Sequence, residues 1–187
     1  MRVLAGDLRG RRLVAPGDDR TRPTAARVRE ALFDVLAPLY PGGGAVLDLY
    51  AGSGALGIEA LSRGFARACF VERGPVALRA LRHNLRTLGV EDRATVVSGD
   101  VGRFLDSPRA TSEHFDLVLA DPPYALGAAA LVGRLGRSAA GPASGLLAVE
   151  HLAREELPPD SGNLERIWSR TYGGTGLSIY RWRWAGT

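Results

Sequence analysis

The sequence predicts an α/β fold in which helices cover both faces of a mostly parallel sheet. Three observations favour this fold. From residue 45 onward, short apolar runs alternate with segments of helical periodicity, as repeated strand–helix units require. A glycine-rich turn, Gly52 to Gly57, directly follows the first apolar run. Near the C-terminal end, two strand-like runs joined by glycines, 166–172 and 177–184, predict an antiparallel hairpin.

The segment before residue 45 differs from the rest. Arg2 to Val14 carries short apolar pairs around glycines and four arginines, which predicts a small basic β-hairpin. A polar loop is expected over 16–22, and a helix over 25–36, where apolar residues recur at helical spacing and Thr24 precedes as an N-cap. We therefore expect two parts: an N-terminal basic β-hairpin and loop over 1–22, and an α/β domain over 23–187.

The elements of the α/β domain follow one another in regular order. Apolar runs that are four to six residues long predict strands over 45–49, 68–72, 94–97, 115–120 and 145–150. Helical periodicity predicts helices over 56–63, 76–88 (ending at Gly89) and 126–135, and a short helix that ends near Phe104. The run 115–120 is nearly all apolar, which suits a central strand covered on both faces.

Composition limits the class of partner. The net charge of +4 and the sequence pI of about 9.8 fit a polyanionic partner, and all 24 basic residues are arginine, whose planar guanidinium suits phosphates. No apolar run reaches the roughly 18 residues of a membrane span, and the first residues do not resemble a signal peptide. The single Cys69 cannot build a disulfide framework, so we expect a cytoplasmic protein, and Cys69 itself is expected to be a buried hydrophobe. We also expect no membrane partner and no metal.

The first apolar run leads into a candidate cofactor site. Its glycine turn matches the dinucleotide fingerprint G-x-G-x-x-G, with Glu72 at the end of the next strand, where a ribose-binding acid belongs. Asp48 lies just before the turn and would repel a pyrophosphate, whereas it suits the positive methionine end of S-adenosylmethionine. The pattern therefore favours S-adenosylmethionine over NAD. We expect the following residues to bind it: Asp48, Tyr50, Gly52, Gly54, Glu72, Asp100 and Val101.

The fourth predicted strand delivers Asp121-Pro122-Pro123-Tyr124 to the same edge of the sheet. An exocyclic base amine is a poor nucleophile because its lone pair is delocalised, so it needs acceptors for both N–H bonds. The Asp121 carboxylate and the Pro122 carbonyl are the expected acceptors, and Pro122 and Pro123 stiffen the backbone. Tyr124 offers a face on which a displaced base can stack. The tetrapeptide therefore predicts methyl transfer to an amino nitrogen without a covalent intermediate.

Taken together, these motifs resemble the RsmD family of ribosomal RNA guanine-N2 methyltransferases. The resemblance also includes Arg2-Val3-Leu4-Ala5-Gly6, Arg9-Gly10-Arg11-Arg12-Leu13, Thr21-Arg22-Pro23-Thr24 and Arg27 to Phe33. It implies a Rossmann-like class I methyltransferase with a seven-stranded sheet. It also implies methylation of the N2 amino group of guanine 966 in 16S rRNA, in the 30S subunit or its precursor.

The same resemblance implies roles for residues near the N-terminus. Arg9, Arg11, Arg12 and Arg22 would bind RNA phosphates, which positions an RNA without reading its sequence. Pro23 and Thr24 would border the cofactor pocket as part of a lid. Positions 25 and 26 are both alanine, where relatives often carry a polar residue, so no substrate contact is expected there.

Other functions stay open on the residues alone. An adenine-N6 methyltransferase acting on DNA or RNA would use the same Asp-Pro-Pro-Tyr chemistry, although the chain has no room for a large target-recognition domain. A glutamine-N5 protein methyltransferase would carry Asn at position 121. A dinucleotide-dependent oxidoreductase would use the glycine turn, and Asp48 argues against it. A non-catalytic RNA-binding module leaves the tetrapeptide unexplained.

Overall fold

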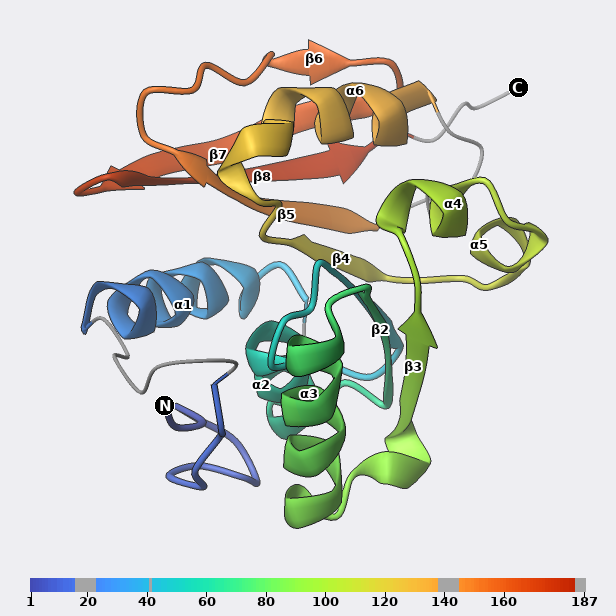
Figure 1. Ribbon diagram of the computed structural model, residues 1–187. Helices are drawn as coiled ribbons and strands as arrows, with labels where there is room; N and C mark the ends of the chain where they lie inside the picture. Colours follow the sequence, from blue (N-terminus) through green and yellow to red (C-terminus); the bar gives the residue numbers. More distant parts are fainter. Residues whose placement is uncertain (16–22, 41, 138–144, 184–187) are drawn as a thin grey trace.

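A single eight-stranded sheet organises the computed structural model, which describes residues 1–15, 23–40, 42–137 and 145–183. The strand order is β3-β2-β1-β4-β5-β8-β7-β6 (Figure 1). The first five strands in this order pair in parallel, and they are β3 (Ala94–Ser98), β2 (Arg67–Glu72), β1 (Ala45–Leu49), β4 (Leu117–Ala120) and β5 (Leu146–Leu152). The last three pair antiparallel, and they are β8 (Thr175–Trp182), β7 (Leu164–Tyr172) and β6 (Asp160–Ser161).

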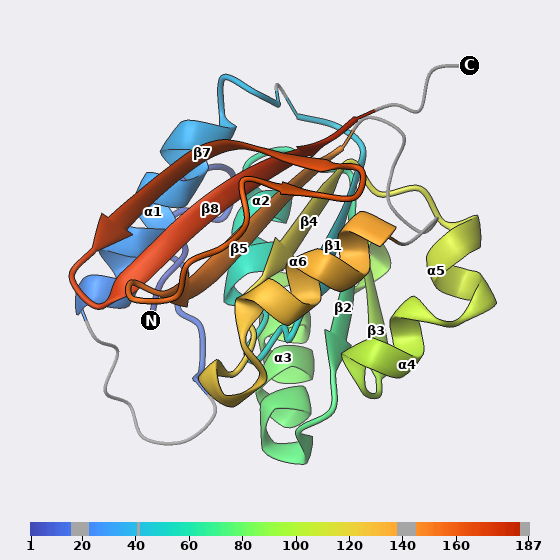
Figure 2. The same cartoon turned by 90° about the horizontal axis from the view of Figure 1, so that it is seen from above.

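Helices cover both faces of this sheet and create two apolar cores. One core lies under α1 (Pro23–Leu36), α2 (Ala55–Ser62) and α3 (Pro75–Leu88). The other lies under α4 (Val101–Leu105), α5 (Pro108–Ser112) and α6 (Ala128–Arg137). Two short 3₁₀ helices, η1 (Glu91–Arg93) and η2 (Tyr124–Leu126), lie in connections. Seen from above, α1 lies beside the β7–β8 hairpin, and α6 crosses the other face of the sheet (Figure 2).

The predicted α/β class, the mostly parallel sheet and the C-terminal antiparallel hairpin are confirmed. The sheet has eight strands rather than seven, because the two-residue β6 adds an edge strand that is too short to leave a periodic pattern. Helix α5 was likewise not predicted. The hairpin turn is tighter than expected, since β8 already begins at Thr175. No described helix has the length and apolar character to cross a membrane.

The predicted N-cap role of Thr24 is wrong. Helix α1 begins at Pro23, so Thr24 belongs to its first turn rather than preceding it. Proline is well suited to the first helical position, because its φ angle is already helical and its missing N–H has no partner to lose there. A proline that precedes a helical pattern can therefore be its first residue.

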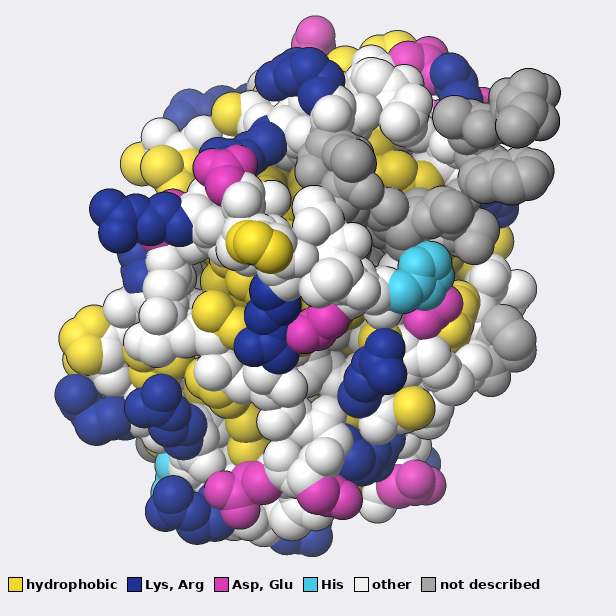
Figure 3. Space-filling model, turned by 90° about the vertical axis from the view of Figure 1, so that its right-hand side faces the viewer, with side chains coloured by type: hydrophobic (Ala, Val, Ile, Leu, Met, Phe, Trp, Pro, Cys, Tyr) yellow, Lys and Arg dark blue, Asp and Glu magenta, His cyan; other side chains and the backbone are white. Residues whose placement is uncertain are grey.

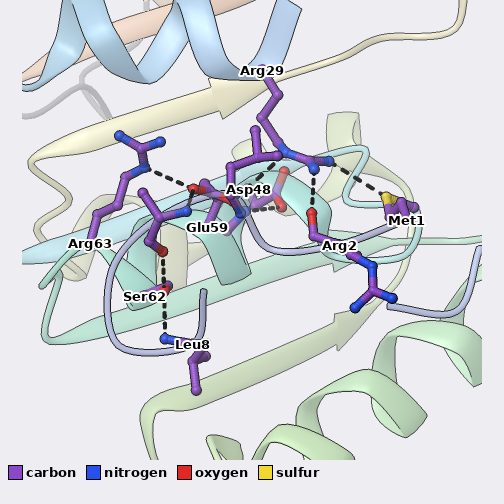
Figure 4. A network of polar contacts seen from close by, with 11 residues as sticks. Met1, Arg2, Leu8, Arg29, Asp48, Glu59, Ser62 and Arg63 are labelled. Carbon is purple, nitrogen blue, oxygen red and sulfur yellow. Dashed lines mark hydrogen bonds and ion pairs between the residues drawn. The ribbon is translucent and has the colours of Figure 1, made fainter. Parts of the chain in front are cut away.

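The N-terminal segment packs against α2 and α3. It folds back on itself as the predicted small hairpin: besides the antiparallel bridge Arg2 to Arg12, the backbone N–H groups of Val3 and Leu13 donate to the carbonyls of Arg11 at 3.0 Å and Met1 at 2.9 Å. Buried Glu59 on α2 accepts the backbone N–H groups of Leu4 at 2.8 Å and Ala5 at 3.0 Å. Figure 4 shows this network around Glu59. The division into an N-terminal part and a larger domain stays a prediction.

The tip of the N-terminal segment lies at the amino ends of the parallel strands. Asp7 donates its backbone N–H to the carbonyl of Ser62, at the end of α2, and the Arg11 guanidinium donates to the carbonyl of Thr87, at the end of α3. Both helices begin beside the carboxyl ends of β1 and β2 and run back toward the opposite edge. The tip is therefore separated from the carboxyl edge by the length of α3, about 21 Å for 14 residues.

Candidate active site

A cavity of about 350 Å³ opens at the carboxyl ends of β1, β2, β3 and β4. Its volume falls in the range of small-molecule sites. Residues from four different connections meet here because the carboxyl ends of parallel strands share one edge of the sheet. The lining residues are Tyr50, Val71, Glu72, Arg73, Gly99, Asp100, Val101, Asp121, Pro122, Pro123 and Tyr124.

The turn after β1 is held in an unusual backbone conformation. Tyr50 has a φ angle of 60°, and among the described residues it is the sole non-glycine residue with a positive φ. Gly52 and Gly54 follow with φ angles of 58° and 81°, a region that side chains with a Cβ rarely adopt. Local strain of this kind concentrates at ligand sites. The backbone conformation of this turn bends the chain sharply and leaves Tyr50 half-buried in the cavity wall.

Asp48 lies behind the cavity wall rather than in its lining. Its side chain is 1% exposed, and Oδ2 accepts the backbone N–H of Gly57 at 2.9 Å. The pKa of Asp48 is raised to about 7, chiefly by desolvation; the hydrogen bond from Gly57 opposes this shift, and the nearby Asp121 and Glu72 carboxylates add to it. Asp48 thus ties the start of α2 to β1, and its contact with a ligand stays a prediction.

Glu72 fixes the opposite wall of the cavity. Its Oε2 atom accepts the backbone N–H of Gly52 at 2.9 Å, and Oε1 accepts the backbone N–H groups of Arg73 at 2.8 Å and Gly74 at 2.6 Å. One carboxylate thus connects the glycine turn after β1 to the loop after β2. The side chain is held in one orientation while it lines the cavity.

Asp100 and Val101 form the third wall. Asp100 is the N-cap of α4 and accepts the backbone N–H of Arg103 at 3.2 Å, while its other oxygen is 3.4 Å from the Arg73 guanidinium. A second cavity of about 240 Å³, which reaches along α6, shares Tyr50, Asp100 and Val101 with the first. The two cavities therefore adjoin and can receive parts of one elongated ligand.

The tetrapeptide after β4 closes the site on its open side. Asp121 is exposed to the cavity, Pro122 is buried, and Tyr124 is 56% exposed. Desolvation by the surrounding protein raises the pKa of Asp121 to about 6. A ligand that enters the cavity therefore meets a carboxyl group, a rigid backbone and an aromatic ring side by side.

Glu150 is a second carboxyl group beside Asp121 that the sequence interpretation missed. Ala120 pairs with Val149, so the next residue on each strand, Asp121 and Glu150, lies at the same level. Desolvation and the charge of Asp121 raise the pKa of Glu150 to about 8. The signal available in the sequence was an acid at the end of a predicted strand, which is also a common place for an ordinary loop acid.

The remaining predicted residues belong to the N-terminal segment, to the start of α1 or to the part of the chain outside the described residues. Arg9, Arg11 and Arg12 are exposed in the N-terminal segment, whose tip is at the opposite edge of the sheet. Pro23 and Thr24 belong to the first turn of α1. Arg22 lies outside the described residues. Asn84 on α3 is buried and donates to the carbonyls of Val14 and Ser53.

The chain is similar to known proteins along nearly its whole length. Residues 1–181 match the model of one protein family, which is described as conserved hypothetical protein 95. The chain is 39% identical over 184 residues to the "Putative rRNA methyltransferase YlbH" of Bacillus subtilis (strain 168), covering 98% of this chain and 100% of that protein.

Two further relatives extend this result. The chain is 40% identical over 125 residues to the "Ribosomal RNA small subunit methyltransferase D" of Haemophilus influenzae; the match covers 66% of this chain and 64% of that protein, slightly less than two thirds of its length. A solved structure titled "Putative methyltransferase yhhF from Escherichia coli" has a TM-score of 0.84 at 33% identity, and the match covers 98% of each chain.

Proposed function

This chain belongs to the RsmD family, and we propose that it transfers the methyl group of S-adenosylmethionine to an exocyclic amino nitrogen in small-subunit ribosomal RNA. By the family resemblance, the target is N2 of guanine 966 in 16S rRNA, in the 30S subunit or its precursor. The observation that carries the proposal is the position of Asp121-Pro122-Pro123-Tyr124. The tetrapeptide opens into the same cavity as Tyr50, Glu72 and Asp100.

The residues that line the cavity fit S-adenosylmethionine. The carboxylate of Glu72 is oriented by three backbone N–H groups and can accept from two ribose hydroxyls. Asp100 and Val101 lie where the cavity adjoins its neighbour, which suits an adenine ring. The buried carboxyl group of Asp48 and the turn at Gly52 and Gly54 favour a cationic methionine end. When bound, the cofactor supplies an electrophilic methyl group on a sulfonium.

The tetrapeptide prepares the amine for attack. Asp121 and the carbonyl of Pro122 accept its two N–H bonds, so the lone pair of the nitrogen turns away from them and toward the cofactor side of the cavity. Pro122 and Pro123 keep that carbonyl in place, because proline fixes φ and adds no competing N–H donor. Tyr124 supplies a stacking face, worth about 1–3 kcal/mol for a base. The nitrogen loses one proton overall, and Asp121 is the nearest base in the site to receive it.

An RNA partner accounts for the exposed arginines of the N-terminal segment. We propose that Arg9, Arg11, Arg12 and Arg22 contact phosphates, with Pro23 and Thr24 bordering the cofactor cavity. Because the tip of the segment lies at the amino edge, such contacts require an RNA long enough to span the molecule, as a ribosomal particle is. These cations would raise affinity and orient the particle without reading its sequence.

The test is the identity of the methylated nucleoside. The enzyme is incubated with labelled S-adenosylmethionine and with 30S subunits that lack the modification, naked 16S rRNA or DNA, and the products are digested to nucleosides. We expect label in N2-methylguanosine from 30S subunits. Label in N6-methyladenosine would establish the alternative that the same tetrapeptide allows, an adenine-N6 methyltransferase.

A calorimetric titration separates the methyltransferase from an oxidoreductase. S-adenosylmethionine should bind with release of heat that fits one site, and NADH should give none. Binding of NADH without binding of S-adenosylmethionine would overturn the assignment of the cavity.

A further inference from the structure

The carboxyl edge of the sheet carries a row of acids on the face covered by α1, α2 and α3. Side chains alternate along a strand, so residues two positions apart share a face. Asp48, Glu72, Asp121 and Glu150 each follow by two positions a residue of that apolar core, namely Val46, Phe70, Leu119 and Ala148. The two acids of this row that line the cavity, Glu72 and Asp121, suit a cationic cofactor, but their carboxylates repel the phosphates of an RNA strand. An RNA whose base enters the cavity therefore needs a cation close to this row.

The strand register places such a cation next to Glu150. Glu150 pairs with Leu177 on β8, and Leu177 pairs with Arg170 on β7. Directly paired residues project from the same face of a sheet, so Arg170 continues the row of acids on the α1 face. Three strand spacings separate β4 from β7, which is about 14 Å. A single RNA strand covers that distance within a few nucleotides.

The guanidinium of Arg170 is exposed and oriented. It lies over the ring of Tyr172, 5.4 Å from the ring centroid, and within the described parts of the chain it takes part in no ion pair. Tyr172 is itself half-buried against the core under α1. An aromatic ring below a guanidinium fixes its plane and leaves its N–H edge free for a bidentate contact to phosphate.

The hairpin that carries Arg170 is fixed to the edge of the active site. Gly173, with a φ angle of 61°, and Gly174 form its two-residue turn, and the carbonyl of Gly174 accepts the backbone N–H of Ala153 at 3.0 Å. The exposed Arg154 follows Ala153 directly and adds a second cation at this corner. By contrast, arginines and acids lie interspersed on the face formed by α4 and α5 (Figure 3), where Arg109 pairs with Glu113 and Arg134 with Asp106.

We propose that Arg170, held over Tyr172, binds a backbone phosphate of the RNA strand that carries the target base, a few nucleotides from that base. This inference rests on the proposed function, because it takes the RNA to enter at Asp121. The residue positions the substrate and takes no part in the chemical step.

The chain contains a matched control. Arg181 lies on the same hairpin and is exposed like Arg170, but it pairs with Leu146 at the amino end of β5. It lies four residues along β8 from Leu177, about 13 Å from the row of Arg170. Arg170→Gln and Arg181→Gln therefore remove the same charge from the same hairpin at opposite edges of the sheet.

The experiment measures binding of unmodified 16S rRNA transcript by filter retention at several salt concentrations, together with methyl transfer to 30S subunits. For Arg170→Gln we expect an RNA Kd raised about 3- to 10-fold and a KM for 30S subunits raised with it. The slope of log K against log salt should fall by about 0.7–0.9, the share of one phosphate contact. Affinity for S-adenosylmethionine should not change, and Arg181→Gln should match the wild type.

Two more variants test the role of the ring. Arg170→Lys keeps the charge and should restore the salt slope, but not the full affinity, because an ammonium does not stack as a guanidinium does. Tyr172→Phe keeps the ring and should bind RNA as the wild type does, whereas Tyr172→Leu should weaken binding. Equal RNA Kd, salt slope and KM for Arg170→Gln and Arg181→Gln would overturn the inference.

The result that would refute the proposed methyltransferase activity differs from the result that would refute the Arg170 contact. A wild-type protein that binds rRNA but methylates no RNA would refute the activity, while the comparison of Arg170→Gln with Arg181→Gln in RNA binding could still support the phosphate contact. A wild-type protein that methylates 30S subunits, with Arg170→Gln unchanged, would refute the contact alone.

Discussion

Asp121 and Glu150 are adjacent carboxyl groups with different surroundings. Asp121 opens into the cavity, whereas Glu150 is half-buried within β5. The pKa of Asp121 is raised to about 6 and that of Glu150 to about 8, chiefly by desolvation. Between these values Asp121 is charged and Glu150 is protonated. An Asp121 carboxylate is therefore available near neutral pH as an acceptor for an amine.

Replacing Asp121 by alanine should lower turnover strongly and leave cofactor binding intact. The variant loses one of two acceptors that the amine needs, and the loss of one preorganised polar contact in an active site lowers kcat about 10²–10³-fold. Labelled methyl transfer and calorimetric titration with S-adenosylmethionine measure the two effects. Asp34→Ala, an exposed change on α1, is the control. An active Asp121→Ala enzyme would remove this carboxylate from the mechanism.

Replacing Glu150 by glutamine should change how stability depends on pH. A carboxyl group whose pKa is raised by folding stabilises the folded state at low pH, and this contribution is lost as pH rises through the folded pKa. For Glu150 that value is about 8. The free energy of unfolding of the wild type should therefore fall relative to Glu150→Gln between about pH 5 and pH 9. Denaturant titrations across this range measure it.

The control for this pH prediction is Glu156→Gln, which changes an exposed glutamate. Its stability should run parallel to that of the wild type at every pH. The acid limb of the methyl-transfer rate, near pH 6, should stay in place in Glu150→Gln, because Glu150 is already protonated there. A stability difference between wild type and Glu150→Gln that does not vary with pH would refute the raised pKa of Glu150 in the folded state.

Among the elements, α2 connects the site to the N-terminal segment. Its first turn donates the Gly57 N–H to Asp48, and Glu59 binds both the N-terminal backbone and two arginines (Figure 4). Glu59 is fully buried; its Oε1 atom accepts from Arg63 at 2.8 Å, and Arg29 lies 3.8 Å from Oε2. Burial lowers the pKa of Arg29, and the charge of Glu59 acts against that shift.

Glu59→Ala should destabilise the protein by about 3–5 kcal/mol, since it leaves the buried Arg29 without its counter-charge and frees two backbone N–H groups. The N-terminal segment should then be cleaved faster by protease than the rest of the chain. Denaturant unfolding and limited proteolysis measure these effects. The matched change Glu30→Ala, on the exposed side of α1, should alter neither; equal cleavage of both variants would show that Glu59 does not hold the segment.

Gly57 determines how closely α2 approaches β2. A Cβ at this position would clash with the ring of Phe70 and lie 3.0 Å from Asp48 Oδ2, so Gly57→Ala should cost about 1–3 kcal/mol. Gly133→Ala in α6 meets only the end of the Arg137 side chain and should be neutral or stabilising. Thermal unfolding of both variants compares them. A Gly57→Ala protein as stable as Gly133→Ala would contradict the close packing.

At the scale of the whole molecule, the two edges of the sheet differ in charge. The carboxyl edge carries the acids and the cavity, and the amino edge carries the tip of the arginine-rich N-terminal segment. A ribosomal particle that places one base in the cavity and also contacts that tip must extend from the carboxyl edge to the amino edge of the protein. The hairpin corner at Arg170 lies at the carboxyl edge, close to the cavity.

The double variant Arg9→Gln/Arg11→Gln should therefore weaken RNA binding through charge alone. We expect affinity to fall equally for any rRNA sequence, the salt slope to decrease by about 0.7–0.9 for each phosphate that is no longer neutralised, and affinity for S-adenosylmethionine to stay unchanged. Filter binding with 16S rRNA and with an unrelated transcript measures this. A weakening confined to one RNA sequence would mean that these arginines read bases.

The sequence by itself determined the α/β class, the succession of strands and helices along the chain, and the residues of two motifs. The reason is that these signals are local, because neighbouring residues carry each of them. They are the periodicity of apolar residues, the glycine turns and Asp121-Pro122-Pro123-Tyr124. The family resemblance depended on the same local signals. Boundaries of one or two residues, α5 and β6 were missed because short elements form through packing against others rather than through their own pattern.

Only the tertiary structure decided which side chains meet. Asp48 is withdrawn from the cavity because α2 covers it, Glu150 stands beside Asp121 because β4 and β5 pair in one register, and Arg170 aligns with Glu150 through β8. The predicted RNA contacts at Arg9 and Arg11 lie at the opposite edge for the same kind of reason. Register and helix direction join residues far apart in the chain, and no local pattern of amino acids records those pairings.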